Sequence, residues 1–108
     1  MTRGDLVIVA TRGAYTGKPR PALVVQSDVF NDTHGSITVC PVTTDVLDAP
    51  LFRVSLPPGS RTGLQSPSQV MVDKVVSVPR ASIDRRIGGC NDAELHVIDD
   101  ALRRWLAL

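Results

Sequence analysis

The sequence predicts a small, mainly β domain in which a strongly curved antiparallel sheet is followed by one amphipathic helix. Along the first eighty residues, short runs rich in β-branched side chains alternate with segments rich in Gly, Pro, Asn, Asp or Ser, the pattern of strands joined by turns. Beyond Gly88 and Gly89 the apolar residues follow a helical period instead. The 108 residues, of which 43% are hydrophobic, can bury one core but hardly two, so residues 1–108 are expected to form a single domain.

The expected strands follow the β-branched runs in chain order. They cover residues 6–9, 22–25, 37–40, 52–56, 70–72 and 75–78. Turn chemistry separates them, at residues 13–21, 31–35, 57–59 and 80–82. Together these runs and turns indicate a small sheet whose strands pair antiparallel.

The helix is expected to start at Asn91, with Glu94 three residues later as its capping-box partner. Two pairs of opposite charge at a spacing of four residues, Asp99 with Arg103 and Asp100 with Arg104, are expected to support it. Its apolar stripe comprises Leu95, Ile98, Leu102, Trp105 and Leu106.

The charge balance excludes two classes of protein. Twelve Lys and Arg against 11 Asp and Glu give a formal net charge of +1, which is neither a strongly basic nucleic-acid coat nor an acidic disordered chain. Residues 1–20 and residues 61–86 each carry a formal charge of +3. If the fold brings these two segments together, they form a basic groove for a phosphate backbone; otherwise they are solvated surface charges.

The cysteines and the N-terminus bear on cofactor and compartment. Cys40 and Cys90 lack C-x-x-C spacing and the histidines are not clustered, so we expect reduced thiols and no metal. The first apolar run, residues 6–10, is too short for a signal-peptide core or a membrane span. A cytoplasmic protein without a membrane contact is therefore expected.

Four segments carry a resemblance to a known family. Residues 3–9, the R-P motif within residues 18–25, the P-x-T motif within residues 40–44 and the paired runs within residues 69–78 resemble the MazF/PemK family of toxin endoribonucleases. The segments occur in the family's order and span most of residues 3–87. The resemblance implies an SH3-like antiparallel β-barrel with a C-terminal helix, a homodimer that cleaves single-stranded RNA without a cofactor, and a cognate antitoxin protein.

The resemblance also implies the catalytic residues. Arg20 matches the family's catalytic arginine, and its planar guanidinium suits two phosphate oxygens at once. Thr43 matches the catalytic threonine, whose hydroxyl donates to a phosphate oxygen. Two alternatives stay open: Arg20 could pair with Asp5 or Asp73, and Thr43 could satisfy a local backbone group. Thr44 could exchange roles with Thr43.

Metal-free cleavage uses the RNA's own 2′-hydroxyl as the nucleophile and leaves a 2′,3′-cyclic phosphate, so a proton acceptor is needed. Some family members place a histidine where this chain has Ala14, and some carry an arginine where it has Met71. The acceptor is expected to be Asp73, which matches an acidic position at the family's RNA site, or Arg20 with solvent. His34 and His96 lie on no family motif and are expected to serve surface or packing roles.

The loop before the R-P motif is a candidate RNA-binding flap. It carries Arg12, Tyr15 and Lys18 together with two glycines, and Tyr15 could stack a base for ~1–3 kcal/mol. The same composition also suits an ordinary solvated hairpin loop.

Two other functions are weighed against RNA cleavage. The DNA-gyrase poison CcdB shares the fold, and residues 25–41 and 77–79 resemble it. Its terminal Trp-Gly-Ile is replaced here by residues 105–108, Trp-Leu-Ala-Leu. CcdB also lacks the R-P and P-x-T pair. The remaining alternative is an inactive barrel that binds RNA or protein.

Overall fold

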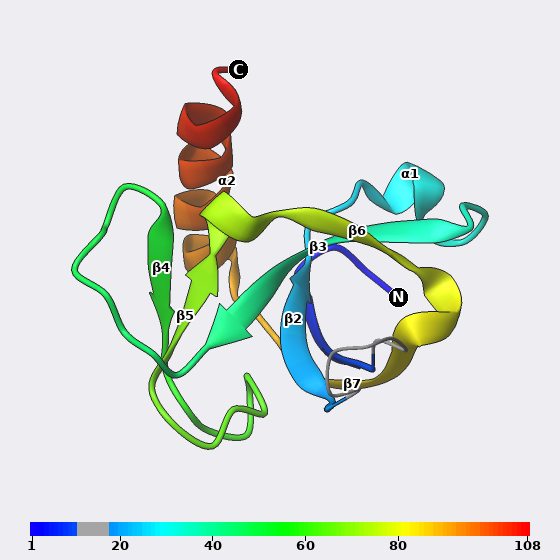
Figure 1. The fold of residues 1–108 in the computed structure, drawn as a ribbon, viewed down its shortest axis with the longest axis horizontal. Helices are drawn as coiled ribbons and strands as arrows, with labels where there is room; N and C mark the ends of the chain where they lie inside the picture. Colours follow the sequence, from blue (N-terminus) through cyan, green and yellow to red (C-terminus); the bar gives the residue numbers. More distant parts are fainter. Residues whose placement is uncertain (11–17) are drawn as a thin grey trace.

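The structure is a computed structural model that describes residues 1–10 and 18–108, and it folds as a bent sheet with one long helix packed against part of it (Figure 1). In chain order the elements are β1 (Asp5–Val9), β2 (Arg20–Val24), α1 (Asp28–Asn31), β3 (Ser36–Thr43), β4 (Arg53–Leu56), β5 (Ser68–Met71), η1 (Val72–Lys74), β6 (Val76–Pro79), η2 (Arg80–Ser82), β7 (Ile83–Gly89) and α2 (Asp92–Leu106), where η1 and η2 are single 3₁₀ turns.

The seven strands pair antiparallel in the order β4-β5-β3-β2-β1-β7, and β6 pairs with β3 beside this path. The eight-residue strand β3 pairs with different strands along its length. Its first half, from Ser36 to Val39, pairs with β6, whereas Val42 and Thr43 pair with β5. Figure 1 shows how this division splays β4 and β5 away from the other strands.

The hydrogen-bonded path ends at β4 on one side and at β7 on the other, so among the described residues no strand ladder closes the expected barrel. The other strands still curl strongly. β6 and β7 follow one another in sequence through η2, and the Ala10 amide donates to the Ser82 carbonyl at 2.8 Å. The expected mainly β class with a C-terminal helix is confirmed.

Alternation along the strands produces two apolar clusters, one on each face of the sheet, where a single core was expected. Leu6, Leu23 and Cys40 face α2 and pack with Ile98 and Ala101 of that helix. Their strand neighbours face the inside of the curl, in the cluster Val7, Val9, Ala22, Val24, Ile37, Val39 and Val78. Successive side chains of a strand point to opposite faces, which explains the division.

Helix α2 begins as predicted. Asn91 Oδ1 accepts from the Glu94 amide at 2.8 Å and Glu94 Oε1 accepts from the Asn91 amide at 2.9 Å, so the capping box is confirmed. The two expected charge pairs are wrong: Asp99 binds Arg3 at 2.7 Å, and Asp100 binds Arg103 at 3.1 Å. Trp105 and Leu106, placed in the apolar stripe, are half exposed.

The sequence predicts neither strand β7 nor the short helix α1. Strand β7 carries Asp84, Arg85 and Arg86 in its middle, because it is an edge strand that pairs only with β1, and it buries only its terminal glycines. The short helix α1 lies just before the turn expected at residues 31–35, overlapping it only at Asn31, and begins at an N-cap, Ser27. No helix in the described part of the chain is long and apolar enough to cross a membrane.

Candidate active site

A pocket of about 360 Å³ lies where β2 begins and β3 ends. Five neighbouring strands (β5, β3, β2, β1 and β7) and one loop form it. Its lining includes both residues of the R-P and P-x-T motifs that were predicted to be catalytic. The lining residues are Ile8, Arg20, Pro21, Val42, Thr43, Thr44, Gly63, Leu64, Gln65, Ser66, Ser68, Arg85 and Ile87.

Strand register explains why Arg20 and Thr43 meet. In the β2–β3 ladder Ala22 lies opposite Pro41, and the strands run antiparallel. Extending that register by two residues sets Arg20 across from Thr43. Pro19 and Pro21 flank Arg20 and restrict the backbone from which its side chain starts.

The Arg20 guanidinium is exposed and has no hydrogen-bond or ion-pair partner among the residues that the structure describes. Every other arginine of the described ranges is held by a carboxylate or a backbone carbonyl. The pairings considered for Arg20 are not formed, because Asp5 binds Arg86 at 2.9 Å and Asp73 binds Arg53 at 2.8 Å. An unpaired guanidinium keeps its donors for a ligand, and it suits phosphate oxygens well.

Thr43 fills the local backbone role and faces the pocket as well. Its Oγ1 accepts a hydrogen bond from the Asp45 amide at 3.0 Å, which orients the hydroxyl at the end of β3. A hydroxyl that accepts one bond still has its own proton to donate. Thr44 also lines the pocket and is more exposed, so the two threonines remain neighbours at the same site.

Asp73, predicted as an RNA-site residue and a candidate base, is not among the residues that line the pocket. Both of its oxygens bind Arg53, at 2.8 and 3.2 Å, and the two side chains are only 15% and 9% exposed. The hydrogen bonds from Arg53 hold the pKa of the Asp73 carboxyl below its usual range. In this structure the ion pair of Asp73 with Arg53 therefore connects η1 to β4.

The predicted flap is described only in part. Lys18 is exposed just before β2 and does not line the pocket, while Arg12 and Tyr15 lie outside the described residues. The structure instead adds a cation that was not predicted individually as a site residue, Arg85 of β7, which pairs with the neighbouring Asp84 at 2.7 Å. Arg20 and Arg85 come from the two +3 segments, so the fold brings one cation of each to the same pocket.

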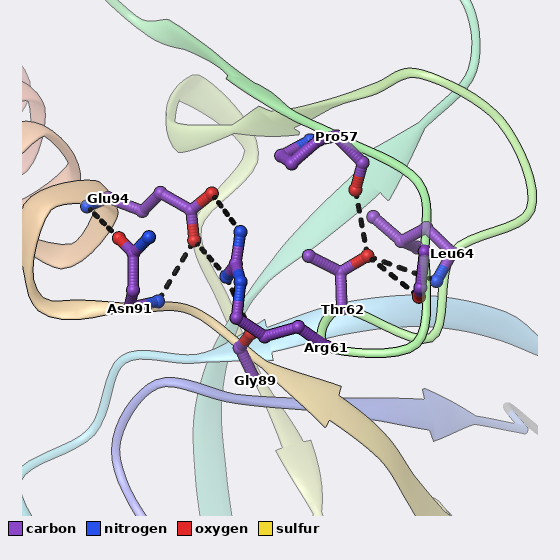
Figure 2. Close-up of polar contacts among 8 residues, drawn as sticks. Pro57, Arg61, Thr62, Leu64, Gly89, Asn91 and Glu94 are labelled. Atoms are coloured by element: carbon purple, nitrogen blue, oxygen red, sulfur yellow. Dashed lines mark hydrogen bonds and ion pairs between the residues drawn. The ribbon is translucent and has the colours of Figure 1, made fainter.

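One wall of the pocket, residues 63–66, belongs to the loop between β4 and β5. Thr62 shapes this loop: its hydroxyl donates to the Pro57 carbonyl at 2.8 Å and accepts from the Leu64 amide at 3.3 Å (Figure 2). Gly63 has a φ of +72°, and a Cβ there would lie 2.0 Å from the Ile87 carbonyl oxygen. Only glycine permits so close an approach of the wall to β7.

The cysteines and histidines do not line the pocket. Cys40 and Cys90 are free, and burial raises the pKa of each thiol to about 12. His34 and His96 are exposed and absent from the pocket lining. Within the described ranges no three His, Cys, Asp or Glu side chains are grouped as metal ligands.

Comparisons with known proteins point the same way. Residues 2–106 match the family model of PemK-like, MazF-like toxins of type II toxin-antitoxin systems. The chain is 46% identical over 108 residues to a probable endoribonuclease MazF of Mycolicibacterium smegmatis, covering 100% of this chain and 98% of the relative. It is 34% identical over 116 residues to endoribonuclease MazF9 of Mycobacterium tuberculosis, covering 100% and 98%.

A solved MazE-MazF structure from Deinococcus radiodurans has a TM-score of 0.83 to this chain at 25% identity, covering 100% of this chain and 97% of that one. The M. tuberculosis toxin MazF-mt6 has a TM-score of 0.82 at 24% identity and shares the fold, covering 96% and 97%. These relatives favour RNA cleavage over the gyrase-poison alternative.

Proposed function

The chain belongs to the PemK-like, MazF-like family of type II toxins, and we propose that it is an endoribonuclease toxin that cleaves single-stranded RNA at the Arg20 pocket. The observation that carries this proposal is that the Arg20 guanidinium, which has no partner within residues 1–10 and 18–108, shares a pocket with the Thr43 hydroxyl. A site built on a free cation and a hydroxyl donor suits an anion whose charge grows during the reaction.

In the proposed reaction the 2′-oxygen attacks the adjacent phosphorus. The 2′-O–P bond forms as the P–O5′ bond breaks, which yields a 2′,3′-cyclic phosphate and a 5′-hydroxyl. Arg20 binds two non-bridging oxygens of the phosphorane, and Thr43 donates its proton as a hydrogen bond to one of them. Both groups are placed before the reaction, so they stabilise the transition state with little reorganisation.

Proton transfer in this scheme does not use Asp73, whose oxygens are both engaged by Arg53. A carboxylate with a lowered pKa is also a weaker base. The 2′-hydroxyl proton passes to solvent at the pocket mouth while Arg20 neutralises the developing anion, and water protonates the leaving 5′-oxygen. Neither transfer in this scheme needs a metal ion.

The partners follow from the family and from the charge of the site. A MazF of D. radiodurans has been solved together with MazE, and we propose that this chain likewise binds a cognate antitoxin. An antitoxin segment with carboxylates and apolar anchors suits the same groove as RNA, because cations placed for phosphates also attract carboxylates. A homodimer would cover the apolar side chains exposed near the end of α2.

We also propose the domain organisation, barrel geometry and cellular location of the toxin. In the proposed state residues 1–108 act as one domain, the curled strands serve as an SH3-like barrel, and the toxin works in the cytoplasm. Two features support the barrel: the curl of the sheet and the direct connection of β6 to β7 through η2.

The decisive experiment incubates the purified protein with a defined single-stranded RNA in EDTA and maps the product ends. We expect cyclic-phosphate and 5′-hydroxyl ends, and a drop in kcat of at least ~10²-fold for Arg20→Ala, the scale of removing one preorganised donor. Arg20→Lys keeps the charge without the planar fork, and Arg103→Ala is a surface control. Activity that disappears in EDTA and returns with magnesium, or a folded Arg20→Ala at full rate, would refute the proposal.

A further inference from the structure

The pocket wall formed by residues 63–66 carries polar side chains, and the backbone of the loop decides whether they can reach a bound RNA. The side chains of Gln65 and Ser66 line the pocket, and in the described part of the chain neither has a side-chain hydrogen bond. An amide and a hydroxyl of this kind can donate to and accept from the base edges of single-stranded RNA. The loop has no helix or strand between the end of β4 and the start of β5, so its position depends on contacts with other elements.

Arg61 joins this loop to two other elements (Figure 2). Its carbonyl accepts from the Gly89 amide at 2.9 Å, and its Nη1 donates to the Gly89 carbonyl at 3.2 Å, which fixes it to the end of β7. The guanidinium also binds both oxygens of Glu94, at 2.6 and 2.9 Å, in the first turn of α2. One residue thus connects the wall, an edge strand and the long helix.

Glu94 is held in place for this contact by a second bond. Its Oε1 accepts from the Asn91 amide at 2.9 Å as part of the capping box, and its side chain is only 15% exposed. Because the carboxylate is oriented by the helix start, the bidentate bond to Arg61 transfers that orientation to the loop. Arg61 is followed directly by Thr62 and Gly63, the residues that shape the wall and pack it on β7.

We propose that Arg61 and Glu94 are positioning residues for RNA cleavage, because their ion pair fixes the wall at residues 63–66 relative to Arg20 and Thr43. This inference rests on the proposed function. The Arg61 side chain is 45% exposed, so the pair contributes little to global stability and its loss leaves the fold intact. A wall displaced by about 1 Å is nevertheless enough to lower the rate of a reaction that depends on alignment.

The test compares matched variants in the same cleavage assay. Glu94→Gln retains the capping-box acceptor but removes the charge, and Arg61→Ala removes the whole contact. We expect kcat/KM to fall about tenfold in both, with thermal midpoints close to wild type. Arg61→Lys should recover part of the loss, because it restores the charge but not the bidentate geometry. Arg103→Ala, which removes an exposed ion pair of the same helix, should leave kcat/KM unchanged.

Amide hydrogen exchange makes the test independent of activity. The Gly63, Leu64 and Gly89 amides donate to acceptors at Gly59, Thr62 and Arg61, in the part of the loop just before the wall. Their exchange should quicken in Arg61→Ala but not in Arg103→Ala. Unchanged kcat/KM and unchanged exchange in both Arg61→Ala and Glu94→Gln would overturn the inference, as would a loss of activity matched by global unfolding. An inactive wild type would instead refute the proposed function, with the exchange data still reporting on the wall.

Discussion

Replacing Asp73 with Asn separates a structural role of this carboxylate from a catalytic one. Asp73 and Arg53 form a bidentate ion pair with side chains 15% and 9% exposed. Removing one partner of a buried pair costs about 3–5 kcal/mol, because the other charge is left without compensation. The lower end applies here, since the pair is not fully buried and the amide oxygen that Asp73→Asn introduces could still accept one bond from Arg53. A loss of about 3 kcal/mol corresponds to a fall in Tm of about 12 °C in a domain of this size.

The same ion pair also predicts how the free energy of unfolding changes with pH. The folded-state pKa of Asp73 is lowered by Arg53, so the pair stabilises the protein above the unfolded pKa of about 3.9, and this contribution is lost as the pH falls through the folded value. The stability difference between wild type and Asp73→Asn should therefore be full at pH 7 and shrink under acid conditions. Chemical denaturation at a fixed protein concentration across this range measures it.

Cleavage by the folded Asp73→Asn protein decides between the two roles. Below its Tm the variant should retain kcat within a few-fold of wild type, because Asp73 does not line the pocket. The double variant Arg53→Met, Asp73→Leu should regain most of the lost stability, since an apolar pair removes the uncompensated charge. A variant with wild-type stability but no cleavage would refute this reasoning and return Asp73 to the candidate bases.

Three further outcomes are expected. Cys40 and Cys90 should react slowly with iodoacetamide at neutral pH in the native protein and rapidly in denaturant, because burial raises the pKa of both thiols to about 12; equal native and denatured rates would contradict this. Sedimentation at micromolar concentration should give a dimer, and a species of only 11.6 kDa would exclude it. A non-cleavable RNA should displace the cognate antitoxin, and Arg20→Ala should weaken antitoxin binding; simultaneous binding of RNA and antitoxin without mutual penalty would disprove a shared groove.

The sequence predicts the parts of this molecule that depend on local chemistry. The capping box at Asn91 and Glu94 needs only two side chains three residues apart, and both bonds are formed. The R-P and P-x-T motifs lie at facing ends of the paired strands β2 and β3, and this pairing brings Arg20 close to Thr43. The family resemblance therefore predicts both residues of the site. Local spacing alone is not sufficient: the expected pair of Asp99 with Arg103 does not form, because Arg3 from a distant part of the chain binds Asp99 instead.

The missed features depend on distant partners. Within the described part of the chain only one edge of β7 is paired, and the strand is polar, so no apolar alternation reveals it and no local signal places Arg85 at the pocket. Asp73 matches a family motif position, but Arg53, 20 residues away, engages both of its oxygens. The tertiary fold decides which arginine pairs with which carboxylate, so these pairs cannot be predicted from the composition.

The pairing of β1 with β7 sets the time at which the pocket forms during synthesis. Ile8 lies opposite Arg85 across this ladder, so one side of the pocket is made by residues 77 positions apart in the sequence. At ribosomal rates the chain needs roughly 2–8 s to grow from Thr43 to Arg85, and contacts this distant are slow to form. A nascent chain that ends before β7 has both motif residues but lacks the Arg85 side of the pocket, and a fragment stopping at residue 80 should be inert toward RNA. The Arg85 side of the pocket therefore forms only after β7 has been synthesised and has paired with β1.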